Sequence, residues 1–594
     1  MIAEQPVSEP PPAQPPTSRV GRLQFAVIGA VVVLAAAIGL VLGLTVLQDR
    51  GQTSLGGSAA YVPANAAIYM EARLDLPAGQ RDSLRAILER FPTLDPDVVL
   101  GEALAQTLDG ALASSNAPFS YSGDIAPWFD GRLAVTLLDY PLNTDPASMQ
   151  LPATAALLGV SDAAAAATFA DAIRTELGAA SGSTFTSTNH GGTTIWTLDV
   201  DETVPLPMQG VGFAYALTDD QLLLANGTAT VEALLNTHAG AGDNLAERDE
   251  LTDLSSHLPA EWSGIVTVDL AAMLESTRTQ LEASSPELAD ALDVYLDAIP
   301  SFAATTIGFE DDVVRFDGVS TMPGGELAPS NGQRDLAASV PQDAIFFADG
   351  PNVGPGLAQA ITGMRASLAA LPDSDMTNQQ IEQVEAALGA NLEDFVTWIG
   401  SGAMAAGWDG EQAWFGLVLE AADADAASQR LGQLRALVEL AAMEPSTEVD
   451  VSSETVGDVE VTSITVAGTS MGGAIPVDSL VVQYALAGDR AVIGFGDRFV
   501  GRVLEVASGG SLAESDRFQT AVQRFGGQDN AGAFFLDLVA LREAVEGAIP
   551  DVDAAAMTTY ANDVRPNLLP LDYLAGVTRV EGEAVVSRYG VVFR

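Results

Sequence analysis

Two stretches of the chain, 269 residues apart, carry the same pattern and determine how the chain is divided. Residues 215–227 read YALTDDQLLLANG, and residues 484–496 read YALAGDRAVIGFG. In both, an apolar run that begins with Tyr-Ala-Leu is followed by a polar turn with an aspartate, a second apolar run and a glycine. Short apolar runs bounded by turn residues are typical of β-strands. Each stretch therefore predicts two strands joined by a tight turn.

Other matches between the two halves of the chain keep the same order. Val-Pro at 62–63 returns at 340–341, and Leu-Ala-Glu at 245–247 returns at 512–514. Collinear matches at nearly constant offsets indicate a tandem duplication, so we predict one domain written twice, over residues 61–325 and 336–594. The repeat-matched residues, for which we predict structural roles, are Pro63, Trp128, Tyr215, Asp220, Gly227, Asp269, Pro341, Trp398, Tyr484, Asp489, Gly496 and Asp537.

Each copy is predicted to be an α+β domain with a mostly antiparallel sheet. Leu84, Ile87, Leu88 and Phe91 follow helical spacing, whereas residues 194–200 alternate as a strand does. Turns such as 218–220 and 310–312 are so short that the strands they join must be antiparallel. Further strands are predicted at 66–72, 132–139, 154–160, 211–217, 221–225, 263–270, 303–309 and 313–320, and helices at 163–177, 228–236, 246–256 and 271–298.

An uncharged apolar stretch near the N-terminus predicts a single transmembrane helix. Residues 25–47 contain no charged side chain and, as a helix rising about 1.5 Å per residue, are long enough to cross a bilayer. Arg19 and Arg22 precede the stretch, and this positive charge places the N-terminus in the cytoplasm. The predicted localisation is the cell membrane, with a single pass over residues 23–48 and everything after residue 50 outside the cytoplasm.

The segments around the predicted span suggest one partner besides the lipid bilayer. Ala35, Gly39 and Gly43 form a stripe of small residues that would let a second helix approach closely, so a homodimer is one predicted assembly. Residues 1–22 form a proline-rich cytoplasmic tail of the kind that stays extended. Residues 49–60 are predicted to be a flexible linker.

The composition excludes several classes of function. The 594 residues include 26 basic and 79 acidic side chains, for a formal net charge of −53, with no cysteine and three histidines. Every basic residue is an arginine, so phosphate loops and Schiff-base chemistry that need lysine are excluded. The absence of cysteine excludes thiol catalysis and thiolate metal sites. The acidic surface argues against nucleic acid as a partner.

Several short motifs suggest a family. The Val-Pro openings at 62–63 and 340–341, the approach at Trp128-Phe129-Asp130-Gly131 and the N-terminal span together resemble the bacterial family catalogued as domain of unknown function 3352. Trp398-Ile399-Gly400 departs from the first copy by one residue. The resemblance implies a membrane-anchored bacterial protein and no known activity, so it supplies no functional residues.

Candidate chemical motifs are each better explained as structure. Residues 468–472 read G-T-S-M-G, but no histidine follows them to complete a hydrolase triad. His190, His238 and His257 have no partner at helical spacing, so surface or capping roles are expected rather than a metal site. Thr228 and Asp497 are predicted to be helix N-caps. Acidic clusters such as 310–312 lack the glycine-containing loop of an EF-hand. We therefore predict no catalytic, cofactor-binding or metal-binding residues and no cofactor.

The sequence leaves three hypotheses about function open. The first is a non-enzymatic envelope protein whose two copies form a surface for a protein or envelope partner. The second is a carrier or sensor with an apolar cavity for a lipid or other hydrophobic ligand. The third is an extracellular hydrolase that uses paired carboxylates. The first is preferred because the chain combines an anchor and a duplication with no recognisable catalytic set.

Overall fold

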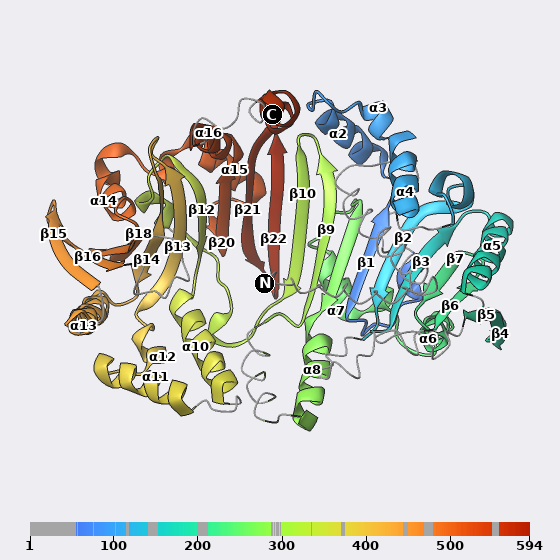
Figure 1. The fold of residues 1–594 in the computed structure, drawn as a ribbon, viewed down its shortest axis with the longest axis horizontal. Helices are drawn as coiled ribbons and strands as arrows, with labels where there is room; N and C mark the ends of the chain where they lie inside the picture. The colour runs from blue at the N-terminus through green and yellow to red at the C-terminus, as the bar shows by residue number, and fades with distance from the viewer. Residues whose placement is uncertain are drawn as a thin grey trace, which may run out of the picture.

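The computed structural model describes residues 55–594 apart from residues 56, 75, 101, 115–117, 140–151, 182, 199–211, 334, 370–374, 444–448, 468–478, 549–557 and several positions between 285 and 298. The fold is α+β with one large antiparallel sheet (Figure 1), as predicted. Within the described residues this sheet has twenty strands, and a second, two-stranded sheet pairs β11 (Gly332–Gln333) with β19 (Asp529–Asn530).

Ten strands of the large sheet come from the first half of the chain. Their order across the sheet is β4-β5-β6-β7-β3-β2-β1-β8-β9-β10, and every neighbouring pair is antiparallel. The strands are β1 (Ile68–Arg73), β2 (Phe129–Leu137), β3 (Thr154–Val160), β4 (Phe185–His190), β5 (Thr193–Leu198), β6 (Phe213–Leu217), β7 (Gln221–Ala225), β8 (Gly264–Asp269), β9 (Phe302–Glu310) and β10 (Val313–Thr321).

The second half of the chain repeats this pairing order. Its strands run β15-β16-β17-β18-β14-β13-β12-β20-β21-β22, again all antiparallel. The strands are β12 (Ala344–Gly350), β13 (Ile399–Trp408), β14 (Ala413–Ala421), β15 (Val449–Val456), β16 (Val459–Ala467), β17 (Ser479–Ala487), β18 (Arg490–Phe495), β20 (Gly532–Asp537), β21 (Leu571–Glu581) and β22 (Ala584–Phe593).

The last strand of each half joins the two halves into one sheet. β10 pairs antiparallel with β22 from Val313 opposite Val592 to Thr321 opposite Ala584. Figure 1 shows these two strands side by side at the centre of the molecule, with β4 and β15 at the two outer ends. We call the β10–β22 pair the seam. Because the seam makes the sheet continuous, the halves are held together by backbone hydrogen bonds as well as by side chains.

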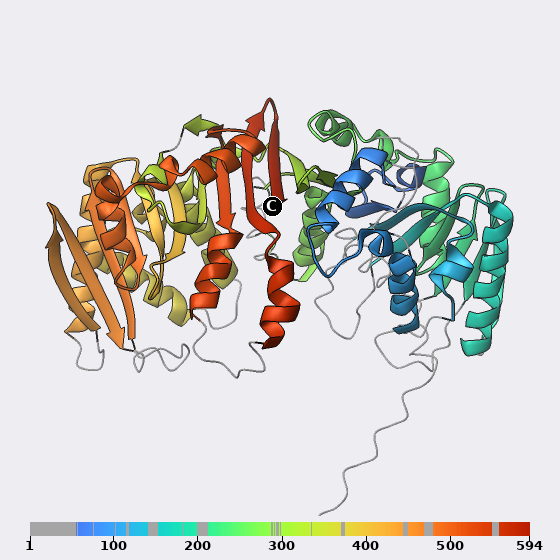
Figure 2. The ribbon, with the colours of Figure 1, turned by 90° about the horizontal axis from the view of Figure 1, so that it is seen from above.

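Helices cover both faces of the sheet in each half (Figure 2). They contact the strands through buried apolar side chains. In the first half they are α2 (Ala78–Leu88), α3 (Pro96–Val99), α4 (Glu102–Ser114), α5 (Ala163–Ser181), α6 (Thr228–His238), α7 (Asp249–Ser255) and α8 (Leu270–Ser284). In the second they are α10 (Val353–Ala369), α11 (Asp375–Leu388), α12 (Leu392–Phe395), α13 (Ala424–Ala442), α14 (Phe499–Gly509), α15 (Asp516–Phe525), α16 (Leu538–Ala548) and α18 (Arg565–Leu568).

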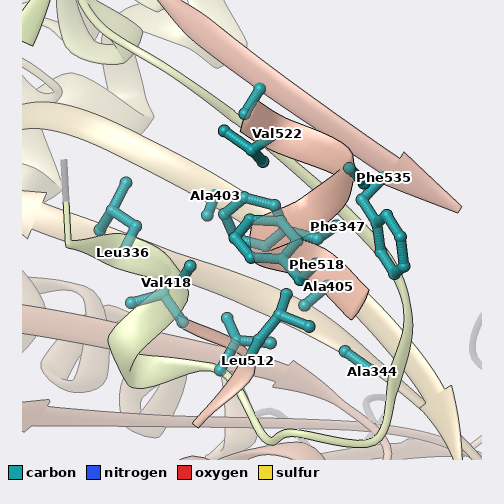
Figure 3. Close-up of a cluster of buried hydrophobic side chains, with 14 of the residues drawn as sticks. Leu336, Ala344, Phe347, Ala403, Ala405, Val418, Leu512, Phe518, Val522 and Phe535 are labelled. Atoms are coloured by element: carbon teal, nitrogen blue, oxygen red, sulfur yellow. The ribbon is translucent and has the colours of Figure 1, made fainter. Parts of the chain in front are cut away.

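Alternating strand residues feed separate cores on the two faces. In β3, Leu157 belongs to the cluster under α6 and α7, whereas Leu158 belongs to the cluster under α4 and α5. This alternation follows from the two-residue period of a strand. The largest cluster lies in the second half (Figure 3), where Phe518 of α15 packs edge-on against Phe347 and Phe535, at ring-centre distances of 5.4 and 5.6 Å.

Some sequence predictions need correction, and others lie outside the described residues. The predicted flexible linker over 49–60 is wrong at its end, because residues 57–60 form a 3₁₀ helix in which Ser58 and Ala59 are buried. Thr228 and Asp497 are not N-caps, because the N-cap residues of α6 and α14 are Gly227 and Arg498. The motif at 468–472 and the predicted span at 25–47, with Arg19, Arg22, Ala35, Gly39 and Gly43, lie outside the described residues.

No helix in the described part of the chain is both long enough and apolar enough to cross a membrane.

Candidate binding pocket at the end of the first-half sheet

A cavity of about 690 Å³ lies where two hairpin turns of the first half meet. The turn at Gly191 and Gly192 joins β4 to β5, and the turn at residues 218–220 joins β6 to β7. Because β5 pairs with β6, both turns fall at the same end of the sheet. The cavity continues onto α5 on one face of the sheet and onto the C-terminal end of α6 on the other. We call it the sheet-end pocket.

One side of the sheet-end pocket is an aromatic stack. The ring of His238, the last residue of α6, lies parallel to the ring of Tyr61 with 3.8 Å between their centres. Tyr61 is buried, whereas His238 is exposed, so the histidine forms the outer layer. The Tyr61 hydroxyl donates to Asp220 Oδ1 at 2.6 Å and lies 3.0 Å from Thr218 Oγ1. Burial and this hydrogen bond to Asp220 raise the pKa of Tyr61.

His190 gives the rim a second imidazole. It is the last residue of β4, and its Nε2 lies 2.7 Å from Oδ1 of Asn236 on α6. An amide oxygen only accepts, so Nε2 carries the proton. Nδ1 lies 3.8 Å from a Glu232 carboxylate oxygen. The hydrogen bond thus ties the end of β4 to the helix that bears His238.

The opposite side of the pocket combines aromatic rings with an ion pair. The Arg174 guanidinium on α5 lies 4.1 Å above the centre of the Trp196 ring and pairs with Asp171 at 3.0 Å. Trp196 is opposite Tyr215 in the β5–β6 register. Burial raises the pKa of Tyr215 to about 12, although the nearby Arg174 guanidinium opposes this rise. These groups offer ring faces and polar atoms to one space.

The second half keeps the strands of this region but not the pocket's side chains. Tyr484 matches Tyr215, yet the residue opposite Tyr484 is Thr462 rather than a tryptophan. Ser339 precedes the Val-Pro of the second half where Tyr61 precedes that of the first, and it accepts a hydrogen bond from Arg490 at 2.9 Å. None of the three histidines recurs. The fold therefore forms without these side chains.

Two of the repeat-matched residues, Tyr215 and Asp220, line the sheet-end pocket, and the others lie elsewhere. Asp269 and Asp537 accept backbone hydrogen bonds at the start of α8 and α16, and pair with Arg248 and Arg517 at 2.6 and 2.7 Å. The remaining eight residues have structural places. They are Trp128, Trp398 and Tyr484, buried in cores, Pro63 and Pro341 in isolated bridges, Asp489, whose carbonyl accepts from Ala421, and Gly227 and Gly496, with positive φ.

The sheet-end pocket was not predicted from the sequence. His190 and His238 have no local partner in the sequence, whereas the structure places both on one rim. His257, the third histidine, lies away from them and contacts Glu581 at 3.2 Å. The sequence signal for the histidines was that they have no counterparts in the second half.

Two of the three carboxylates that line the pocket have partners within the chain. Here Asp171 contacts the Arg174 guanidinium, and Asp220 accepts the Tyr61 hydroxyl. Throughout the described residues, no group of three or more histidine, aspartate or glutamate side chains is placed to hold a metal ion.

The fold and the pocket define an α+β protein in which one antiparallel sheet runs through two similarly ordered halves, with a polar and aromatic pocket at one end. The chain matches the family model described as "Protein of unknown function (DUF3352)" over residues 26–575. It therefore belongs to this family, as the sequence motifs predicted. No curated protein matches. A solved crystal form of the protein TP0453 is similar at 8% identity and a TM-score of 0.22, over 46% of this chain and 82% of that one. This low TM-score carries no argument about function.

Proposed function

We propose that this protein is a membrane-anchored extracytoplasmic protein that acts by binding, and that the sheet-end pocket is its recognition site. Residues 25–47 would anchor it, with Arg19 and Arg22 on the cytoplasmic side. The two halves, over residues 61–325 and 336–594, would be tandem copies of one domain outside the cytoplasm. The first copy would hold the ligand, while the second supports the sheet and presents a surface to a protein or envelope partner.

The observation that carries this proposal is the difference between the halves. Both halves form the same strand order, but only the first surrounds the end of its sheet with Tyr61, His190, Trp196 and His238. Side chains that the shared fold does not need, gathered around one cavity of ligand size, are the usual sign of a binding site.

The lining of the sheet-end pocket argues against a hydrophobic ligand there. Asp171, Asp219, Asp220 and Asn236 all face it, and burying them against a lipid chain would cost their hydration without replacing it. The apolar side chains are instead gathered in five buried clusters among the described residues. The interaction hypothesis is therefore kept in preference to the lipid carrier.

Two measurements test the proposal. Protease added to intact cells should remove the part of the protein after residue 50, and protection of that part would contradict the topology. Native mass spectrometry of the full-length protein, extracted gently from its own membrane, should show a small stoichiometric adduct. The adduct should be lost in His238→Ala and kept in His257→Ala, whose histidine lies outside the pocket. A bare protein under all extraction conditions would contradict a binding role for the pocket.

A further inference from the structure

We infer that the sheet-end pocket binds a neutral saccharide. This inference rests on the proposed function and adds the chemical class of the ligand. It follows from three properties of the pocket, namely its charge, its mixture of hydrogen-bond donors and acceptors, and its aromatic surfaces.

The charge of the pocket excludes anionic ligands. Asp171, Asp219 and Asp220 contribute three carboxylates. The nearby Arg174 already pairs with Asp171 and covers the Trp196 ring. The chain as a whole carries a formal charge of −53, so its long-range field also repels anions. A phosphate, a nucleotide or an acidic sugar would therefore be opposed both on approach and in the pocket.

The polar atoms of the pocket match hydroxyl groups better than an ammonium group. An ammonium ion only donates, so a site for it would offer acceptors alone. Here carboxylate acceptors lie beside groups that can also donate, including the Asn236 amide and the hydroxyls of Thr193 and Thr194. A sugar hydroxyl donates and accepts at the same oxygen, and so can use both kinds of group. A site built to bond hydroxyl groups also discriminates strongly against ligands that lack them.

The aromatic groups supply a surface for the apolar face of a sugar ring. His238 stacks on Tyr61 with its inner face, and it is itself exposed, so its outer face is free to receive a ring. Tyr61 fixes the plane of His238, and because Tyr61 is held by Asp220 it does not need to reorder on binding. Flat carbon–hydrogen faces next to hydroxyl edges are the combination that sugar rings provide, and the cavity of about 690 Å³ is of ligand size.

Isothermal titration of the full-length protein tests the inference. The probes are maltotriose and triacetylchitotriose as neutral saccharides, with spermidine and sialyllactose as cationic and anionic comparators. We expect at least one neutral saccharide to bind, and neither charged comparator. His238→Ala should weaken that binding roughly tenfold, as loss of one stacking contact would. Asn236→Ala should also weaken it, because the substitution removes a donor and an acceptor from the lining of the pocket.

The control variant is His257→Ala, which removes a histidine that lies outside the pocket and should leave saccharide affinity unchanged. If spermidine binds and the saccharides do not, the inference is overturned while the proposed binding function stands. A native adduct whose mass is not that of a saccharide would overturn it in the same way. If neither saccharide binds, or if His238→Ala and His257→Ala weaken binding equally, the assignment of saccharide to this pocket is wrong.

Discussion

At the scale of single residues, a glycine in β14 allows a helix to lie directly on the sheet. A Cβ added to Gly416 would lie 2.1 Å from Cδ1 of Phe499 and 2.4 Å from the Ile493 carbonyl oxygen. Phe499 is fully buried at the start of α14, so neither group can move away. Overpacking of this kind costs about 1–3 kcal/mol. We therefore expect Gly416→Ala to lower the free energy of unfolding by at least that amount in chemical denaturation.

Gly432 is the matched control for this substitution. It lies within α13, and nothing approaches its added Cβ within 4 Å. Alanine is favoured over glycine inside a helix by about 1 kcal/mol, so Gly432→Ala should leave the protein unchanged or slightly more stable. Equal losses from both substitutions would show that the contact with Phe499 is not the cause.

The Tyr61 hydroxyl should contribute measurably to stability. It donates to the Asp220 carboxylate at 2.6 Å, and a hydrogen bond to a charged group contributes about 1.5–3 kcal/mol when buried. Since Tyr61 is largely covered but Asp220 is exposed, we expect Tyr61→Phe to cost about 1 kcal/mol in thermal or urea unfolding. Tyr484→Phe is the control, because that hydroxyl interacts with the neutral Thr462 side chain rather than with a carboxylate. A larger loss in the control would contradict this account.

The residues of the candidate site could be predicted from the sequence only in part. Tyr215 and Asp220 stand out because they recur in the second copy. Trp196, His190 and His238 do not recur, and they come from β5, β4 and α6. What brings them together is the pairing of β5 with β6 and the placement of α6 over the same strands. Local periodicity carries no information about such contacts, so the pocket became visible only in three dimensions.

At the scale of elements, the turn between β9 and β10 holds a strained residue. Asp311 has a φ of 49°, and the matching turn between β21 and β22 has Gly582 at 67°. A left-handed backbone costs a side-chain-bearing residue about 1 kcal/mol, although aspartate tolerates it better than most. We expect Asp311→Gly to raise the melting temperature slightly, and Gly582→Ala to lower it. Shifts of the same sign at these two positions would contradict the turn geometry.

Strands were easier to predict than their order. The predicted strands at 154–160 and 221–225 coincide with β3 and β7, because each is a short apolar run between turn residues. That β3 pairs with β7 could not be predicted, since the partners are more than 60 residues apart in sequence. The helix α4 was not predicted at all. Pairing between distant strands depends on the whole chain rather than on a local pattern.

At the scale of the whole molecule, the seam departs from symmetry at its centre. β10 and β22 are matching strands of the two halves, and their residue numbers differ by 271. Val313, the first residue of β10, corresponds to Ala584, the first residue of β22, and Asp317 corresponds to Arg588. These two residues also face each other in the seam. Two identical strands paired in this way would place like charges together, whereas the two halves of this chain place an acid opposite a base. The fused chain thus stabilises a pairing that separate identical copies would disfavour.

Side-chain contacts at the two ends of the seam connect each half to the turn of the other. Arg524 at the end of α15 pairs with Asp312 in the β9–β10 turn. His257, which follows α7 in the corresponding place, contacts Glu581 at the β21–β22 turn. The side chains in both contacts are about one-third exposed, so the Arg524–Asp312 ion pair should contribute about 0.5–1 kcal/mol at most.

The Arg524–Asp312 pair should make the joining of the halves sensitive to acid. Burial alone would raise the pKa of Asp312, but the Arg524 guanidinium outweighs it and holds this pKa below its usual value. A carboxyl group whose pKa is lower in the folded state stabilises the protein above its unfolded pKa of about 3.9, and this contribution is lost as the pH falls through the folded value. Arg524→Gln should therefore be about 0.5–1 kcal/mol less stable than the parent at pH 7 in urea unfolding, and nearly equal to it at pH 2.

Arg430→Gln, on α13 and away from the seam, is the control and should show a difference that does not change between the two pH values. A deficit in Arg524→Gln that stayed constant from pH 7 to pH 2 would mean that its packing, not its charge, supports the seam.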